Sequence, residues 1–188
     1  MRRFFVAPEQ INEDQIVITG SDAHHLNRVI RLGEGDEVLV FDGTGLEYTV
    51  TIEKVESDRV LGRVIAANSS VKEPMFKVTL VQGIPKGDKM DLIIQKTTEL
   101  GVFRIIPVLT ERTVVKLEDS KKAKRQERWQ KIAREASKQC RRSTVPEIAP
   151  IQSLKEYLDE LNDGEQGVVL WEEEHSRGIK SIFKKQQG

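Results

Sequence analysis

A strand–helix–strand pattern between residues 76 and 109 constrains the fold more than any other feature of the sequence. Phe76–Val81 is an apolar run, and residues 88–100 repeat apolar side chains at helical spacing. Gly101 stands where a glycine commonly ends a helix, and Arg104–Leu109 is a second apolar run. The inward face of the helix is expected to carry Met90, Ile93, Ile94, Thr97 and Leu100. This βαβ unit predicts a parallel sheet with a right-handed crossover, and so an α/β domain.

The residues that precede this unit are instead typical of short strands separated by turns. The expected strands are Arg3–Val6, Ile16–Thr19, Glu37–Asp42, Glu47–Glu53 and Arg59–Ile65. One helix interrupts them after Ser21, which can cap it, and Leu26, Val29 and Ile30 form its inward stripe. Arg28 and Arg31 lie on the other side of that helix. Short strands at regular spacing with one helix predict a small barrel.

The two patterns meet in residues 66–74, which lose all periodicity and end in a proline. We therefore expect one domain over residues 1–70 and a second over residues 74–188. In the second domain, Lys121–Cys140 is a long helix, Ser153–Leu161 a shorter one, and Gly167–Trp171 a further strand.

The long helix concentrates the positive charge of a chain whose formal net charge is zero. Its apolar side carries Trp129, Ile132, Ala133, Ala136 and Cys140. The opposite side, which we call the basic rail, gathers Lys124, Arg128, Lys131, Arg134, Lys138 and Arg142. A concentrated basic segment favours a polyanionic partner, but a helix face that is merely solvated explains the charges equally well.

The loop before the first helix of the βαβ unit holds Lys86 and Lys89 on either side of Gly87-Asp88. The spacing fits neither a nucleotide-hydrolase phosphate loop nor a dinucleotide fingerprint. A helix start capped by Asp88, with two lysines beyond the carboxyl end of a strand, can bind an anion. Lysines that only solvate a capped helix are the alternative, with about equal weight.

Composition excludes several classes of protein. No apolar run approaches the roughly 18–20 residues that span a bilayer. The single cysteine, Cys140, forms no internal disulfide, and the lack of an export signal favours the cytosol. His24 and His25 are adjacent and point apart on a helix, so a zinc site is not expected.

Three long blocks of the sequence resemble one family. The blocks are "HHLNRVIRLGEGDEVLVFDGTGLEY" (24–48), "PKGDKMDLIIQKTTELGVFRIIPVLTERTVVKL" (85–117) and "RWQKIAREASKQCRRSTVPEI" (128–148). They are similar to the signature blocks of the bacterial small-subunit (16S) ribosomal RNA uracil-N3 methyltransferases, the RsmE family. The resemblance implies an N-terminal PUA-like RNA-binding β-barrel and a SPOUT-type α/β methyltransferase domain with a trefoil knot. It also implies S-adenosyl-L-methionine as the cofactor, a homodimer, small-subunit ribosomal RNA or the assembled subunit as partner, no membrane, and a cytoplasmic protein.

The chain departs from the family pattern in one respect. Family members continue into a "GPEGG" loop and an "LGxRxLRxET" motif, which form the knot and most of the cofactor pocket, and this sequence contains neither. We therefore expect the methyltransferase domain to be incomplete at its C-terminus and these 188 residues to bind the cofactor poorly and not to methylate. A non-catalytic RNA-binding module is the alternative function, and an unrelated enzyme that binds a nucleotide phosphate at Gly87 comes third.

The resemblance also suggests which residues carry the function. Arg112 is the candidate for stabilising a uridine anion, with Glu99 or Glu111 as proton acceptor. By its place in the family pattern, the strand end at Leu170, Trp171 and Glu172 would line the cofactor site. We expect RNA contacts from Arg28, Arg31, Lys86, Lys89 and the basic rail, mostly to phosphates.

Overall fold

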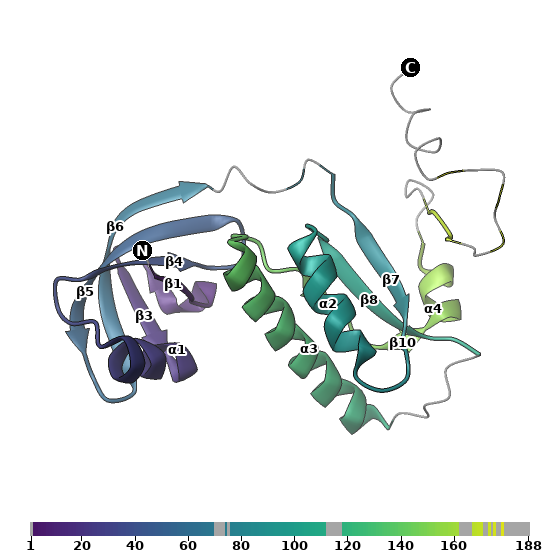
Figure 1. Ribbon diagram of the computed structural model, residues 1–188, viewed down its shortest axis with the longest axis horizontal. Coiled ribbons are helices and arrows are strands. Elements are labelled where there is room, and N and C mark those ends of the chain that lie inside the picture. The colour runs from purple at the N-terminus through teal and green to yellow at the C-terminus, as the bar shows by residue number, and fades with distance from the viewer. Residues whose placement is uncertain are drawn as a thin grey trace, which may run out of the picture.

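The computed structural model describes residues 2–69, 74, 76–111, 118–161, 167–170, 173, 175 and 178, which build two sheets along the chain (Figure 1). The first sheet has six strands in the order β1-β4-β5-β6-β3-β2. They are β1 (Arg3–Phe5), β2 (Ile11–Asn12), β3 (Gln15–Thr19), β4 (Glu37–Phe41), β5 (Leu46–Val55) and β6 (Arg59–Ser69). The β1–β4 pair is parallel and the other pairs are antiparallel. All five expected strands are confirmed; the two-residue β2 was not predicted.

Strands β5 and β6 curl this sheet into a half-barrel. The pairing shifts register between Thr49 and Val50 and again between Ile52 and Lys54. Such bulges bend a strand and increase its twist. Gly62 in β6 has no room for a side chain, because a Cβ at this position would be 2.4 Å from Cγ1 of Val50 in β5. The concave side holds a core of Phe4, Val6, Ile16, Ile18, Ala23, Leu26, Val38, Val40, Val50, Ile52 and Val60.

The helical segments of the half-barrel differ from the predicted single helix. A 3₁₀ turn, η1 (Pro8–Gln10), precedes β2, and α1 (Gly20–His24) continues directly into a π-helical segment, η2 (His25–Ile30). Thr19, not Ser21, occupies the N-cap position. The wider π turn keeps Leu26 and Ile30 against the core but turns Val29 outward, where it is 63% exposed.

The second sheet contains β7 (Thr79–Gly83), β8 (Arg104–Leu109), β9 (Glu147–Ile148) and β10 (Gln152–Ser153). Every pair is parallel, as the βαβ pattern predicted. β9 and β10 pair with the two ends of β8 and together act as one interrupted strand.

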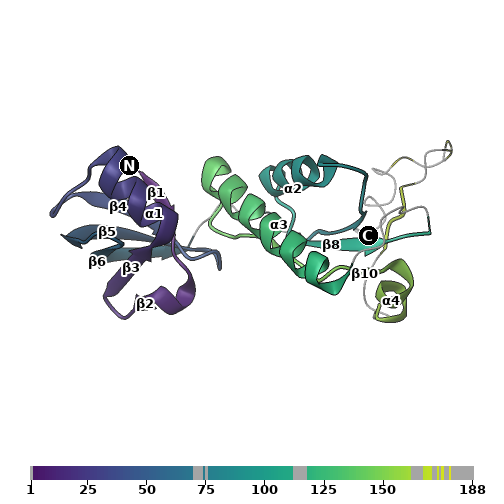
Figure 2. The ribbon, with the colours of Figure 1, turned by 90° about the horizontal axis from the view of Figure 1, so that it is seen from below.

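Helices cover both faces of this sheet (Figure 2). α2 (Lys89–Glu99) and α3 (Asp119–Cys140) pack on one face, and α4 (Leu154–Asp159) packs on the other. The first face buries Met90, Ile94, Ile105, Trp129, Ala133 and Ile148 among others. The second buries Ile106, Val108 and Ala149, against which Leu154 and Tyr157 pack. β8 alternates its side chains between the two faces, as a strand buried on both sides must.

The end of α2 shows why the predicted inward face was partly wrong. Gly101 is left-handed, with φ of 98°, and its N–H donates to the Thr98 carbonyl while the Val102 N–H donates to the Thr97 carbonyl. This is a Schellman motif, in which the chain turns away from the helix axis. Leu100 is therefore 84% exposed, and Thr98 is buried in its place.

Two predicted strands also need correction. The strand expected at Phe76–Val81 begins at Thr79 and ends at Gly83, and Phe76 is 75% exposed. The register explains the shift, because Thr79 pairs with Arg104, the first residue of β8. Of the strand expected at Gly167–Trp171, residues 167–170 are described, and they form no strand and are exposed.

Candidate functional site

The carboxyl ends of the parallel strands lie at one edge of the second sheet, which we call the carboxyl edge. The register pairs Gly83 with Val108 and Leu109 with Ser153, so β7, β8 and β10 end side by side. The loop that holds Lys86 and the short segment that holds Glu111 leave the sheet at this edge. Ligands of open parallel sheets bind beyond such an edge.

The loop after β7 presents two unpaired cations at the carboxyl edge. Lys86 and Lys89 are exposed, and neither forms an ion pair with any residue that the structure describes. Gly87 is left-handed, with φ of 69°, and no atom lies within 4 Å of the place a Cβ would take. The backbone of the loop is therefore open to a ligand.

Asp88 does not cap α2 as predicted. It occupies the N-cap position, but its side chain makes no capping hydrogen bond and instead lies 3.9 Å from the Arg128 guanidinium. Asp91 in the first turn is the acid that ties the helix down. It accepts hydrogen bonds from Arg128 Nη2 and from Trp129 Nε1, the latter at 3.2 Å, and so fixes the start of α2 against α3.

The structure does not bring the two candidate proton acceptors together. Glu99 is the last residue of α2 and pairs with Lys96 at 2.8 Å. The chain then crosses the whole sheet in β8 before it reaches Glu111, a distance of about 20 Å for six strand residues. Glu111 is exposed at the carboxyl edge. Arg112 lies outside the described residues.

Of the three residues expected to line the cofactor site, Leu170 is described, and it is 80% exposed. Trp171 and Glu172 lie outside the described residues.

The basic rail is not one continuous free surface. Lys124 and Lys131 are exposed and, within the described part of the chain, unpaired. Arg134 stacks over the Phe5 ring at 4.4 Å, and Lys138 pairs with Asp22 at 2.6 Å. The C-terminal half of the rail thus faces the half-barrel, a partner that a helical wheel cannot show.

Arg142 is the member of the rail that departs most from prediction. α3 ends at Cys140 because Arg141 adopts a left-handed conformation, with φ of 63°, so Arg142 lies beyond the helix. Its side chain is only 7% exposed, and Nη1 donates to the carbonyls of Thr98 and Val102, both at 2.9 Å. The guanidinium therefore caps the negative end of α2.

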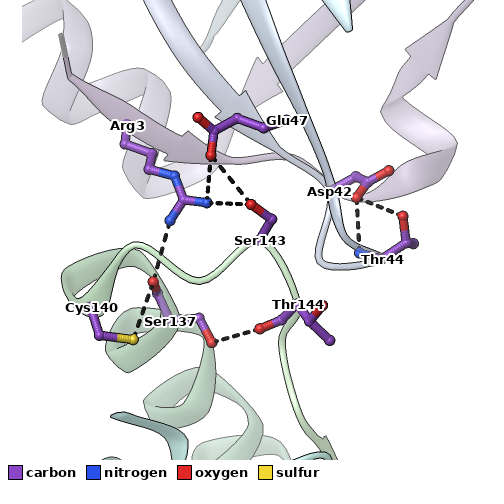
Figure 3. Close-up of polar contacts among 8 residues, drawn as sticks. All are labelled: Arg3, Asp42, Thr44, Glu47, Ser137, Cys140, Ser143 and Thr144. Atoms are coloured by element: carbon purple, nitrogen blue, oxygen red, sulfur yellow. Dashed lines mark hydrogen bonds and ion pairs between the residues drawn. The ribbon is translucent and has the colours of Figure 1, made fainter. Parts of the chain in front are cut away.

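A second polar cluster, which the sequence did not predict, joins the half-barrel to the C-terminal end of α3 and the residues that follow it (Figure 3). Arg3 Nη2 donates to Glu47 Oε2 at 2.9 Å and to Ser143 Oγ at 3.1 Å, while Nη1 donates to the Ser137 carbonyl at 3.3 Å. The same guanidinium lies 4.1 Å from the Phe41 ring centre. We call these contacts the Arg3 clamp. An arginine in an N-terminal strand gave no signal for this role, because its partners lie up to 140 residues away.

Backbone contacts reinforce the Arg3 clamp. The Gly45 N–H donates to the Ser143 carbonyl at 3.2 Å, and the Val145 N–H donates to the Gly43 carbonyl at 3.0 Å. Asp42, which is 6% exposed, holds this turn by accepting hydrogen bonds from Thr44 N–H and Oγ1, both at 2.8 Å. The half-barrel and α3 are therefore held in one orientation.

Asp42 also accepts a hydrogen bond from the Tyr48 hydroxyl at 3.2 Å. Burial raises the pKa of the Tyr48 hydroxyl above its usual value, and the neighbouring Asp42 charge and hydrogen bond raise it further.

Elsewhere in the half-barrel, hydrogen bonds from Lys54 and Arg59 lower the pKa of the Glu56 carboxyl. Arg28 and Arg31 are exposed beside η2, as predicted, and Arg31 is left-handed, with φ of 59°.

The described residues contain no group of three or more His, Cys, Asp or Glu side chains placed to hold a metal ion. None of the helices in that part of the chain is long and apolar enough to cross a bilayer.

Both parts of the chain match families of known proteins. Residues 18–65 match the family described as RNA methyltransferase PUA domain. Residues 71–188 match the family described as RNA methyltransferase domain.

Curated relatives share one name, ribosomal RNA small subunit methyltransferase E. The Bacillus subtilis (strain 168) protein is 39% identical over 186 residues, which are 97% of this chain and 73% of that protein. The Synechocystis sp. (strain PCC 6803) protein is 34% identical over 168 residues, which are 89% of this chain and 54% of that protein. Nothing in these matches supports the inactivity expected from the sequence.

Two solved structures similar to this one contain the cofactor. The Neisseria gonorrhoeae ribosomal RNA small subunit methyltransferase E, bound to S-adenosyl methionine, is 35% identical with a TM-score of 0.77, over 87% of this chain and 67% of that one. A putative methyltransferase from Legionella pneumophila, in complex with bound SAM, is 30% identical with a TM-score of 0.75, over 86% of this chain and 67% of that one. With its PUA half-barrel and parallel-sheet methyltransferase domain, this chain belongs to the RsmE family of small-subunit ribosomal RNA methyltransferases.

Proposed function

We propose that this chain transfers a methyl group from S-adenosylmethionine to N3 of a uridine in small-subunit ribosomal RNA. The observation that carries the proposal is the 39% identity to the Bacillus subtilis enzyme across 97% of this chain. We further propose that residues 1–70 bind RNA and that residues 74–188 form the methyltransferase domain. A homodimer that acts in the cytoplasm, where ribosomes are assembled, completes the proposal.

The carboxyl edge is the proposed place of the reaction. S-adenosylmethionine, when bound, supplies an electrophilic methyl group on its sulfonium. The uridine N3 carries a weakly acidic proton, so this chain must supply a base and a group that stabilises the anion. Of the two candidate proton acceptors, Glu111 is the one that lies at this edge, and Arg112 follows it in sequence. We propose this pair for the two roles; Glu99 lies at the other end of β8.

Among the cations predicted to contact RNA, we propose those that are exposed and have no partner within the described residues. They are Arg28 and Arg31 beside η2, Lys86 and Lys89 at the carboxyl edge, and Lys124 and Lys131 on α3. Arg128 is 60% exposed and can reach RNA while it holds Asp91. Arg134, Lys138 and Arg142 already have partners within the protein and are proposed to support the fold.

Methyl transfer can be measured directly. Purified chain is mixed with S-adenosylmethionine labelled on the methyl group and with small ribosomal subunits from cells that lack the corresponding enzyme. The Bacillus subtilis relative serves as the positive control. We expect labelled 3-methyluridine after digestion of the RNA to nucleosides. Glu111→Gln should lower the turnover rate while cofactor and RNA affinities stay unchanged, and Glu99→Gln is the matched control.

Three results would contradict parts of the proposal. Binding of the RNA without any transfer of label would favour the non-catalytic RNA-binding module. Label in a nucleoside other than 3-methyluridine would refute the assigned atom. Normal turnover of Glu111→Gln would remove this residue from the mechanism.

A further inference from the structure

A cleft of about 980 Å³ lies between the half-barrel and the C-terminal half of α3, which Figures 1 and 2 show side by side. Its half-barrel wall comes from β1, the start of α1, η2 and the end of β6. Its other wall comes from the last turns of α3. Charged residues on the two walls are Arg2, Arg3, Asp22, Glu47, Glu135, Lys138 and Arg141.

The three carboxylates of the cleft lie beside two cations of the protein. Glu47 pairs with Arg3 at 2.9 Å, and Asp22 pairs with Lys138 at 2.6 Å. Glu135 lies 3.6 Å from the same Lys138 ammonium. The acids therefore do not repel an anion as strongly as their number suggests.

Two arginines of the cleft remain without a partner. The side chains of Arg2 and Arg141 are exposed and make no ion pair or hydrogen bond with any part of the chain that the structure describes. Four cations against three carboxylates leave the cleft one surplus positive charge. The two unpaired guanidinium groups suit phosphate oxygens because they donate in a planar fork.

Arg141 stands at a position that disfavours it. Its φ of 63° is left-handed, and a helix end of this kind usually carries glycine, since a side chain there costs roughly 1–2 kcal/mol. Strained residues of this type cluster at functional sites. Arg31, at the end of η2, shares the same conformation and is also an exposed arginine.

Uncharged polar side chains complete the lining. Asn68 and Ser69 at the end of β6 are exposed, as is Gln139 on α3, and His25 projects from η2. None of these side chains makes a hydrogen bond to the described residues. They offer donors and acceptors of the kind that bind ribose hydroxyls and base edges.

The cleft lies far from the carboxyl edge. On α3, Arg128 lies 3.9 Å from Asp88 at that edge, and the ten helical residues from Arg128 to Lys138 at the cleft span about 15 Å. A nucleotide strand that rises about 3.4 Å per stacked residue needs about four nucleotides to cover that distance. One nucleotide cannot occupy both places in one protomer.

We propose that this cleft is a second RNA-docking site, which holds the sugar–phosphate backbone of a segment several nucleotides away from the methylated nucleotide. The inference rests on the proposed function, because it takes ribosomal RNA as the ligand. The Arg3 clamp fixes the walls of the cleft relative to the carboxyl edge. The cleft therefore selects RNA by the distance between two segments as well as by the nucleotide that is methylated.

Filter binding of small-subunit ribosomal RNA, without cofactor, tests the proposal. The variants are Arg2→Gln, Arg141→Gln and the pair together; Lys155→Gln on α4 is a matched control that removes one charge on the other face of the sheet. A lost phosphate contact costs roughly five-fold in affinity at 0.15 M salt and lowers the salt slope by roughly 0.7–0.9. We expect that loss for each arginine, additivity in the pair, recovery in Arg141→Lys, and no change in Lys155→Gln.

Several outcomes would refute RNA binding in the cleft. Unchanged RNA affinity in the double variant Arg2→Gln/Arg141→Gln would refute it and leave the proposed methylation intact. Equal losses in the pair and in Lys155→Gln would show general electrostatic attraction only. Displacement of the RNA by polyglutamate at equal charge would show a site for any polyanion. If the parent chain binds no ribosomal RNA, the cleft and the proposed substrate both fail.

Discussion

Replacing Arg142 separates the structural role of this side chain from a role in RNA binding. In Arg142→Ala the carbonyls of Thr98 and Val102 lose a charged donor, and the C-terminal end of α2 loses its compensating positive charge. The Thr98 carbonyl keeps the hydrogen bond from the Gly101 N–H, which limits the damage.

The size of the effect follows from these contacts. A hydrogen bond from a charged donor contributes roughly 1.5–3 kcal/mol, and a partly buried cation at a helix end contributes up to about 2 kcal/mol. Removing a buried charge also recovers part of its desolvation cost. We expect the free energy of unfolding of the methyltransferase domain to fall by about 2–4 kcal/mol.

Urea unfolding followed by tryptophan fluorescence measures this change. Trp129 is 4% exposed between α2 and α3, so its fluorescence reports on the unfolding of these two helices. Every variant also carries Trp171→Phe, which removes the second tryptophan of the chain. Arg141→Ala is the matched control, since the neighbouring side chain is exposed and should change stability by less than about 0.5 kcal/mol. Arg142→Lys should lie between the two.

One result would refute the capping of α2 by Arg142. If Arg142→Ala unfolds within about 0.5 kcal/mol of the parent and binds ribosomal RNA more weakly, the guanidinium serves RNA and not α2.

Two further predictions concern the half-barrel. Gly62→Ala places a Cβ 2.4 Å from Val50 Cγ1, so we expect the free energy of unfolding, measured in urea, to fall by about 1–3 kcal/mol. Gly33→Ala has no atom within 4 Å of the new Cβ and should cost much less; equal losses for the two variants would contradict the clash with Val50. The Tyr48 pKa is raised in the folded chain, so the folded state holds this proton more tightly than the unfolded state. The stabilisation is therefore complete below about pH 10 and is lost as the pH rises through the folded pKa. Tyr48→Phe should unfold at a lower urea concentration at pH 8 and show a shallower loss of stability above pH 10, and parallel curves for variant and parent would refute this.

The sequence predicted the elements whose signal is local. Arg104–Leu109 was predicted at its observed bounds, because an apolar run between Gly101 and the polar residues that follow has only one way to be buried on both faces. The turn at Gly101 was predicted because a glycine commonly ends a helix, and the end of α3 at Cys140 was also predicted.

What the sequence could not predict depends on contacts between distant residues. A helical wheel places Arg134 and Lys138 on one side of α3 but cannot show that Phe5 and Asp22 of the half-barrel cover that side. Glu99 and Glu111 are twelve positions apart in sequence, yet β8 lies between them and carries them to opposite ends of the sheet. Val29 left the predicted stripe because the π turn changes the helical period, and this change has no signature in a single sequence.

The Arg3 clamp has a consequence for how the chain folds during synthesis. Arg3 is among the first residues made, but its partner Ser143 follows 140 positions later. The half-barrel is complete at Ser69, 74 positions before Ser143. At about 5–20 residues per second, it waits roughly 4–15 seconds before the end of α3 emerges to cover Arg3 and Phe5. During that interval the Phe5 ring, which Arg134 of α3 covers in the folded chain, has no partner from α3.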